Sequence, residues 1–189
     1  MSDQPAFHNE LEIRILSGED RRVKQTLITP NAISDDFLTG HWGIYTKSCD
    51  FASWMRLALF PDGPEWASWV WDPGDPWAPY ALSENRTSDP SADPLYMTGT
   101  PSWNATVDKW QVFYQWTQLP QDFNLKALGF LGADSLLGQI QQGIVDNYSA
   151  FPVYTLAVLP SSIPIKGRLL GTQTPDILQV TYYLSVVGV

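Results

Sequence analysis

The chain has 189 residues, of which 44% are hydrophobic and only 16% are charged, with a formal net charge of −9. A surface that follows nucleic-acid phosphates needs clustered Lys and Arg, and here these residues are scattered, so the composition argues against nucleic-acid binding. No apolar run approaches the roughly 18 residues of a membrane span, and no signal-peptide pattern is apparent. We therefore expect a protein that is made in the cytoplasm and does not contact a membrane.

The first third of the chain predicts a β-hairpin followed by two more strands. Leu11, Ile13 and Ile15 alternate with other residues, a Ser-Gly-Glu-Asp turn follows, and an extended pattern resumes over residues 23–29. Residues 41–47 and 51–60 are the next predicted strands.

Residues 61–103 have a different composition. They hold eight of the 15 prolines and five of the nine tryptophans. Proline lacks an amide donor, which excludes a regular central sheet, whereas disordered segments are poor in aromatic residues. We therefore predict an ordered loop insertion around a short strand at residues 66–71. Long structured insertions are usually functional, so this segment is expected to be a contact surface.

The C-terminal half predicts more strands. The pattern favours strands at 110–117, 125–131, 151–159 and 163–170, with the last two separated by Pro160-Ser161-Ser162. Residues 135–147 show near-helical spacing weakened by two glycines. Residues 175–189 read as one closing strand with a period of two.

Nine or ten short strands with frequent turns predict one all-β domain over residues 1–189. We expect an antiparallel, jelly-roll-like β-sandwich with little helix and with residues 61–103 as its insertion. A single sheet closed on itself is the alternative.

No sequence pattern indicates catalysis, a metal or a cofactor. His8 and His41 have no metal-ligand spacing, and the single Cys49 has no neighbouring cation that would stabilise a thiolate. Asp72 and Asp75 lie among tryptophans, which allows a glycosidase or a calcium site, but solvated loop acids are the preferred interpretation. We therefore predict that the protein is not an enzyme and binds no cofactor.

The candidate interface residues come from the insertion and from the closing strand. Tryptophans of the insertion suit stacking on sugar rings, but the preferred interpretation is that they hold the loop on the sandwich or bury against another subunit. A strand at the end of a chain must pair and bury its residues, so it is expected to be a structural member of a sheet or of an interface, where it can add to a neighbour's sheet. The candidates are Trp66, Trp69, Trp71, Trp77, Val180, Tyr182 and Leu184.

Three C-terminal segments carry a family resemblance: Leu-Pro-Gln-Asp-Phe-Asn-Leu-Lys-Ala-Leu-Gly-Phe at 119–130, Ile-Pro-Ile-Lys at 163–166, and Leu-Gln-Val-Thr-Tyr-Tyr-Leu at 178–184. In these segments the chain resembles structural proteins of tailed-bacteriophage particles. The resemblance implies a β-sandwich subunit of the tail, baseplate, neck or fibre-attachment region. Such a subunit is assembled into the virion in the host cytoplasm and contacts copies of itself and other virion proteins.

Two other functions fit the same predicted fold. One is a carbohydrate-binding module or adhesin that recognises a host surface glycan through the tryptophans. The other is a capsid decoration protein, which would lie on heads rather than tails.

Overall fold

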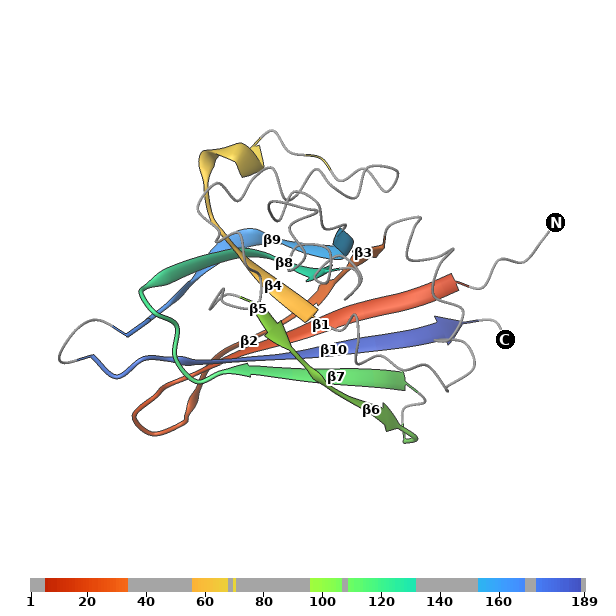
Figure 1. Ribbon diagram of the computed structural model, residues 1–189, viewed down its shortest axis with the longest axis horizontal. Coiled ribbons are helices and arrows are strands. Elements are labelled where there is room, and N and C mark those ends of the chain that lie inside the picture. Colours follow the sequence, from red (N-terminus) through yellow and green to blue (C-terminus); the bar gives the residue numbers. More distant parts are fainter. Residues whose placement is uncertain are drawn as a thin grey trace, which may run out of the picture.

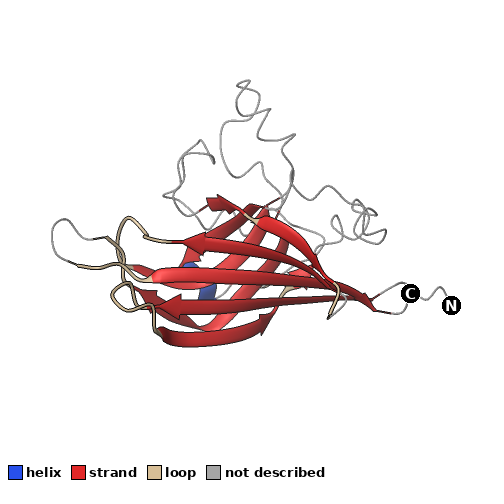
Figure 2. Ribbon diagram, turned by 90° about the horizontal axis from the view of Figure 1, so that it is seen from below, coloured by secondary structure: helices blue, strands red, loops and turns tan. Residues whose placement is uncertain are grey.

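The computed structural model describes residues 6–33, 56–67, 70, 96–106, 109–131, 153–168 and 173–187. These residues form ten β-strands and one short 3-10 helix. The strands make two antiparallel five-stranded sheets that face each other (Figures 1 and 2). The prediction of an all-β sandwich with little helix is therefore confirmed. The strand predicted at 41–47 and the helical pattern at 135–147 lie outside the described residues.

The first sheet has the strand order β2-β1-β10-β7-β6. Its strands are β2 (Val23–Pro30), β1 (Ala6–Leu16), β10 (Ile177–Val187), β7 (Lys109–Trp116) and β6 (Thr100–Asn104). β1 and β10 pair along their full lengths, so the two ends of the chain lie side by side in the middle of this sheet (Figure 1). The predicted hairpin of β1 and β2 and the predicted strand at β7 are confirmed.

The second sheet has the strand order β3-β9-β8-β4-β5. Its strands are β3 (Ala32–Ile33), β9 (Val153–Ile165), β8 (Phe123–Leu131), β4 (Arg56–Pro61) and β5 (Tyr96–Thr98). β8 lies between β9 and β4 and pairs antiparallel with both.

Two segments of the chain pass from one sheet to the other at the edges of the sandwich. On one side β2 continues into β3 through Asn31, and on the other β5 continues into β6 through Gly99. A Cβ added at Gly99 would lie 2.4 Å from Val112 Cγ1 and 2.5 Å from Tyr114 Cε1, so only glycine fits at that bend. Strands that switch sheets make the corners of such packings, and here they connect both edges.

The core lies between the two sheets. It is built from every second residue along each strand, whose side chains point toward the opposite sheet. The predicted shared face of β10 is confirmed, because Leu178, Val180 and Tyr182 all point into this core. The fully packed cluster consists of Leu11, Ile13, Ile15, Leu57, Leu59, Val112, Tyr114, Trp116, Leu119, Phe123, Leu125, Leu128, Ala157, Leu159, Ile163, Ile165, Leu178, Val180 and Tyr182.

Residues 61–103 differ from the prediction where they are described. The segment predicted as a strand at 66–71 begins instead within a 3-10 helix, η3 (Pro64–Ala67). The end of the predicted insertion contains the strands β5 and β6. β6 tolerates Pro101 because it is an edge strand, where a missing amide donor breaks no ladder on its outer side.

β9 is one strand, although two strands were predicted on either side of Pro160-Ser161-Ser162. Its register with β8 jumps from Ala127 opposite Val158 to Leu125 opposite Ile163, so these residues form a bulge inside the strand. The Lys126 ammonium donates hydrogen bonds to the carbonyl oxygens of Leu159 at 2.8 Å and Pro160 at 3.3 Å. A side chain from the neighbouring strand thus satisfies the carbonyls that the bulge takes out of the ladder.

Candidate functional site

Trp66 packs onto the outer face of the second sheet. Its residue is 8% exposed, and its indole Nε1–H donates a hydrogen bond to the Pro61 carbonyl at 2.9 Å. Its ring meets that of Phe60 edge to face, with 6.2 Å between centroids and 75° between planes. The indole proposed from sequence as a contact residue is therefore held by its own chain, through both its polar and its apolar parts.

The outer face of the second sheet is apolar and buried. Ala58 and Phe60 alternate along β4 with the core residues Leu57 and Leu59, so they point away from the core. Both are nevertheless at most 1% exposed, and Leu156 on β9 is 2% exposed. The sandwich therefore carries a second apolar layer outside its central core.

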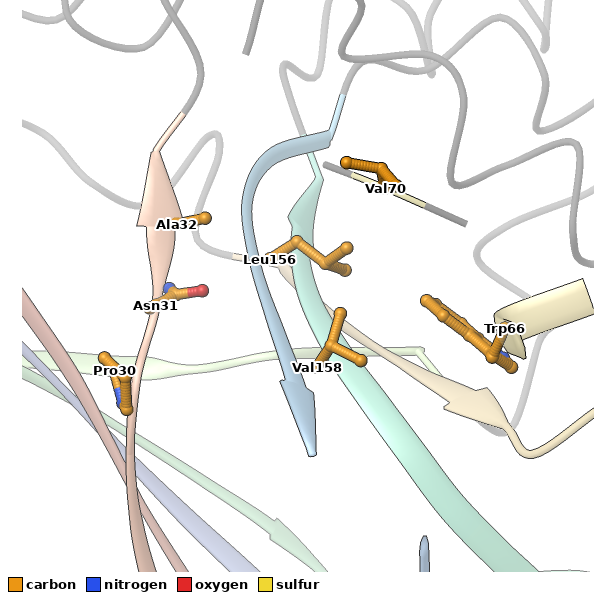
Figure 3. A pocket seen from close by; sticks show the side chains of 7 residues that line it. All are labelled: Pro30, Asn31, Ala32, Trp66, Val70, Leu156 and Val158. Carbon is orange, nitrogen blue, oxygen red and sulfur yellow. The ribbon is translucent and has the colours of Figure 1, made fainter. Parts of the chain in front are cut away.

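A pocket of about 580 Å³ lies on this second layer, next to the bend between β2 and β3 (Figure 3). Val70 and Val158 are 80% and 37% exposed and lie at its open side, whereas Leu156 is buried. None of the described side chains that line it is charged, and its size falls in the usual range for ligand pockets. The lining residues are Pro30, Asn31, Ala32, Trp66, Val70, Leu156 and Val158.

Asn31 is the one polar, non-aromatic side chain among the described residues that line this pocket. Its residue is 8% exposed, and its Oδ1 has no hydrogen-bond partner among the described residues. Figure 3 shows the side chain directed from the bend toward Leu156. A buried carbonyl without a donor costs about 1–3 kcal/mol, so this acceptor favours an incoming N–H or O–H group. Sequence reasoning missed Asn31, because Pro-Asn after a strand indicated only a turn.

Two other buried polar atoms also lack a partner in the described part of the chain, Trp116 Nε1 and Thr155 Oγ1. Neither residue lines the pocket. Asn31 is therefore the residue at which an unsatisfied group and a pocket coincide.

The outer face of the first sheet is polar: its charged residues Glu10, Glu12 and Arg14 lie on β1, and β6, β7 and β10 carry mostly amide and hydroxyl side chains. The register places Gln115 beside Gln179 and Gln111 beside Tyr183. Gln179 Nε2 donates to Gln115 Oε1 at 2.8 Å, and Asn104 Nδ2 donates to Gln111 Oε1 at 3.1 Å. We call this surface the amide face and define it by Asn104, Gln111, Phe113, Gln115, Gln179, Thr181 and Tyr183.

Tyr183 is the central aromatic residue of the amide face. Its hydroxyl donates to Glu12 Oε2 at 3.2 Å, and the Lys109 ammonium lies 6.0 Å from its ring centroid. Burial raises the pKa of the phenol, and the negative charge of Glu12 raises it further. Tyr183 is therefore a neutral hydrogen-bonding group at physiological pH.

The closing strand is a central strand of the first sheet, so of its two predicted roles, member of a sheet or part of an interface, the described residues show the first. β10 pairs with β1 on one edge and with β7 on the other, so its backbone groups are used within the chain. Val180 and Tyr182 are at most 2% exposed and belong to the core. The backbone of Leu184 is paired on both sides, and its side chain is outside the description. The hazard of an exposed strand end is thus removed by placing the strand in the middle of the sheet.

The remaining predicted site residues mostly lie outside the described residues. This applies to the other three candidate tryptophans, to Asp72 and Asp75, and to His41 and Cys49. His8, in β1, pairs through its backbone with Ser185 in β10. Within the described ranges no group of three or more His, Cys, Asp or Glu residues is placed to hold a metal ion. No helix of the described part has the length and apolarity to cross a membrane. The undescribed candidates are Trp69, Trp71, Trp77, Asp72, Asp75, His41 and Cys49.

The one strongly buried carboxylate of the described part has a structural role. Asp176, 4% exposed, accepts hydrogen bonds from the Lys24 ammonium at 2.9 and 3.0 Å and from the backbone N–H of Lys166 at 3.1 Å. Lys24 belongs to β2 in the first sheet, and Lys166 follows β9 in the second. The carboxylate thus ties the two sheets together, and its oxygens are already occupied.

Comparison with known proteins gives no relative. No family model, no curated protein and no solved structure matches this chain.

Proposed function

We propose that this protein is a non-enzymatic structural component of a bacteriophage particle, associated with the tail, baseplate or neck. It acts through homo-oligomerisation and through contacts with other virion proteins. The observation that carries the proposal is the amide face, a surface of β6, β7 and β10 with half-buried amide groups, the half-buried Tyr183 and the exposed Phe113, whose charged neighbours Glu10, Glu12, Arg14 and Lys109 lie at its rim. Protein interfaces are depleted in charged residues at their centre and enriched in Tyr and Phe, as this surface is.

The segments that resemble phage structural proteins belong to the framework of the sandwich. Residues 123–125 pair with residues 163–165 in the second sheet, and residues 178–184 lie in the middle of the first sheet. These segments support the proposal through a shared framework, whereas the contacts themselves belong to the outer faces.

Particle incorporation tests the proposal. Quantitative mass spectrometry of gradient-purified particles should find the protein at a constant ratio to the major particle proteins. Phe113→Glu places a charge on the amide face at a residue that is 39% exposed, and we expect it to lower incorporation at least several-fold. Val23→Glu, at a residue that is 48% exposed on β2, is the matched control and should be incorporated normally. Recovery of the protein only in the soluble fraction would contradict the proposal.

A carbohydrate-binding function is the second candidate, and the amide face also favours it. Side-chain amides offer donors and acceptors together, which matches sugar hydroxyl groups, and the ring of Phe113, which is 39% exposed, is available for stacking. Retention on a glycan array that disappears in Gln111→Ala, with folding unchanged, would support this function instead. If neither the wild type nor Gln111→Ala is retained on the array, carbohydrate binding by the amide face is excluded.

A further inference from the structure

We propose that the pocket beside the β2–β3 bend binds one aromatic side chain that carries a hydrogen-bond donor, Tyr or Trp, from a neighbouring protein chain. The donor bonds to Asn31 Oδ1, and the ring lies on the second apolar layer. This inference rests on the proposed structural function, since it names how one contact of the subunit is made.

The lining of the pocket determines what kind of group it accepts. Of the seven described residues that line it, six are apolar and none is charged. Trp66 contributes an aromatic wall, and aromatic pairs gain about 0.5–1.5 kcal/mol beyond the area they bury. A charged group entering here would lose its hydration without gaining a partner in the lining. The occupant is therefore neutral, largely apolar and aromatic.

The unsatisfied acceptor of Asn31 determines the polar part of the occupant. Oδ1 is buried and has no donor in the described part of the chain. An N–H or O–H group that reaches it therefore forms a hydrogen bond and also removes the desolvation cost of the unsatisfied oxygen. Phenol and indole each carry one such donor at the edge of an apolar ring, whereas the phenyl ring carries none. Tyr and Trp are therefore favoured over Phe.

The open side of the pocket favours a side chain of a protein over a free small molecule. Pockets for free ligands bury most of the ligand surface, but here Val70 is 80% exposed and Val158 is 37% exposed. Aromatic anchors at protein interfaces gain from the surrounding contacts of their own chain, and they do not need full enclosure by the pocket.

The test uses the full chain with labelled Leu and Val methyl groups and follows Leu156 and Val158 by NMR. The probes are the N-acetyl amides of Tyr, Trp and Phe. We expect saturable shifts of both residues, with the Tyr and Trp probes binding about three- to tenfold more tightly than the Phe probe, the factor given by one hydrogen bond. Equal binding of the three probes, or no saturable shift, would overturn the inference.

Two variants separate pocket binding from other effects. Asn31→Leu removes the acceptor and should abolish the preference for Tyr and Trp over Phe. Val158→Trp fills the open side from an exposed position and should abolish binding of all three probes, whereas Ile28→Trp, at a residue that is 59% exposed on the first sheet, should leave it unchanged. Tighter binding of free 4-methylphenol or indole than of the amide probes would contradict the assignment to a protein side chain.

Particle incorporation and probe binding are measured separately, so that failure of the pocket inference can be told apart from failure of the proposed function. A wild-type protein found in particles without probe binding would overturn the pocket inference alone. Probe binding by a protein absent from particles would overturn the proposed function.

Discussion

Arg21 shows at the scale of one residue how the turn between β1 and β2 is built. Its φ is 57°, in the left-handed region, and the turn is closed by hydrogen bonds between Ser17 and the backbones of Arg21 and Arg22. The backbone N–H of Arg22 and the Ser17 hydroxyl lower the pKa of Asp20 in the same turn. The left-handed conformation costs a residue with a Cβ about 1–2 kcal/mol, and a β-branched residue most of all.

We predict that Arg21→Gly keeps or slightly raises the free energy of unfolding, because glycine adopts this conformation without steric cost. Arg21→Val should lower it by up to about 1 kcal/mol, the excess cost of a β-branched residue over Arg in this conformation. Urea denaturation of the two variants checks the prediction. Equal stabilities for Gly and Val at this position would show that the turn does not constrain φ.

Tyr183 gives a pH-dependent prediction at the same scale. Burial first and the charge of Glu12 second raise the pKa of its phenol in the folded state above that in the unfolded state. The stability that the neutral phenol contributes is therefore complete below about pH 10 and is lost as the pH rises through the folded-state pKa. In Tyr183→Phe this loss should be absent, so the variant should lose less stability than the wild type above pH 10.

Ultraviolet titration of tyrosinate at alkaline pH gives the direct measurement. The difference between wild type and Tyr183→Phe should titrate above the ordinary tyrosine range, and Glu12→Gln should move that midpoint down. A difference curve with an ordinary midpoint would mean that Tyr183 is solvated.

At the scale of elements, the sequence predicted strands best where alternation and turn residues agreed. β2 and β7 fall within a residue of their predicted bounds, because their strand patterns and flanking turns agree, whereas β1 begins five residues before the predicted alternation at Leu11. The errors come from proline, which was taken as a break. In β9 Pro160 lies in a bulge, and in β6 Pro101 lies on an edge strand, and a strand tolerates both.

The outer layer could not be predicted from the same patterns. The strands that contain Phe60 and Leu156 carry apolar residues on both faces. This pattern predicts that both faces are buried, but it does not predict where a pocket lies. Asn31 becomes informative only when the bend between sheets is known, because its buried oxygen depends on packing between β3 and β9.

The corner at Gly99 makes a prediction at this scale. In Gly99→Ala the new Cβ would overlap side-chain atoms of Val112 and Tyr114, which are core residues at most 2% exposed and have no free space to move into. We expect a loss of about 1–3 kcal/mol in unfolding free energy and faster amide exchange in β5 and β6. Ser102→Ala, on an exposed position of β6, is the control and should change stability by less than about 0.5 kcal/mol. Unchanged exchange in Gly99→Ala would mean that the corner can shift without cost.

At the scale of the whole molecule, the first and last strands form the centre of one sheet, and two bent strands connect the sheets at both edges. The central strands therefore have no free edge for another chain. Association through the outer faces is then one route open to the described part, beside pairing at the edge strands, and it agrees with the proposed roles of the amide face and of the pocket.

Removal of β10 tests this central role. Deleting residues 176–189 removes the pairing partner of both β1 and β7, together with the buried side chains Leu178, Val180 and Tyr182. Each of these side chains contributes about 1.5–3 kcal/mol through burial, and a native protein has only about 5–15 kcal/mol in total. We therefore expect loss of cooperative unfolding and of dispersed NMR signals across both sheets, rather than the loss of one contact surface from a folded subunit. A chain lacking only residues 188 and 189, which follow β10, should unfold cooperatively like the wild type. Cooperative unfolding of the longer truncation would show that β10 is an accessory strand, and its role in neighbouring contacts would have to be considered again.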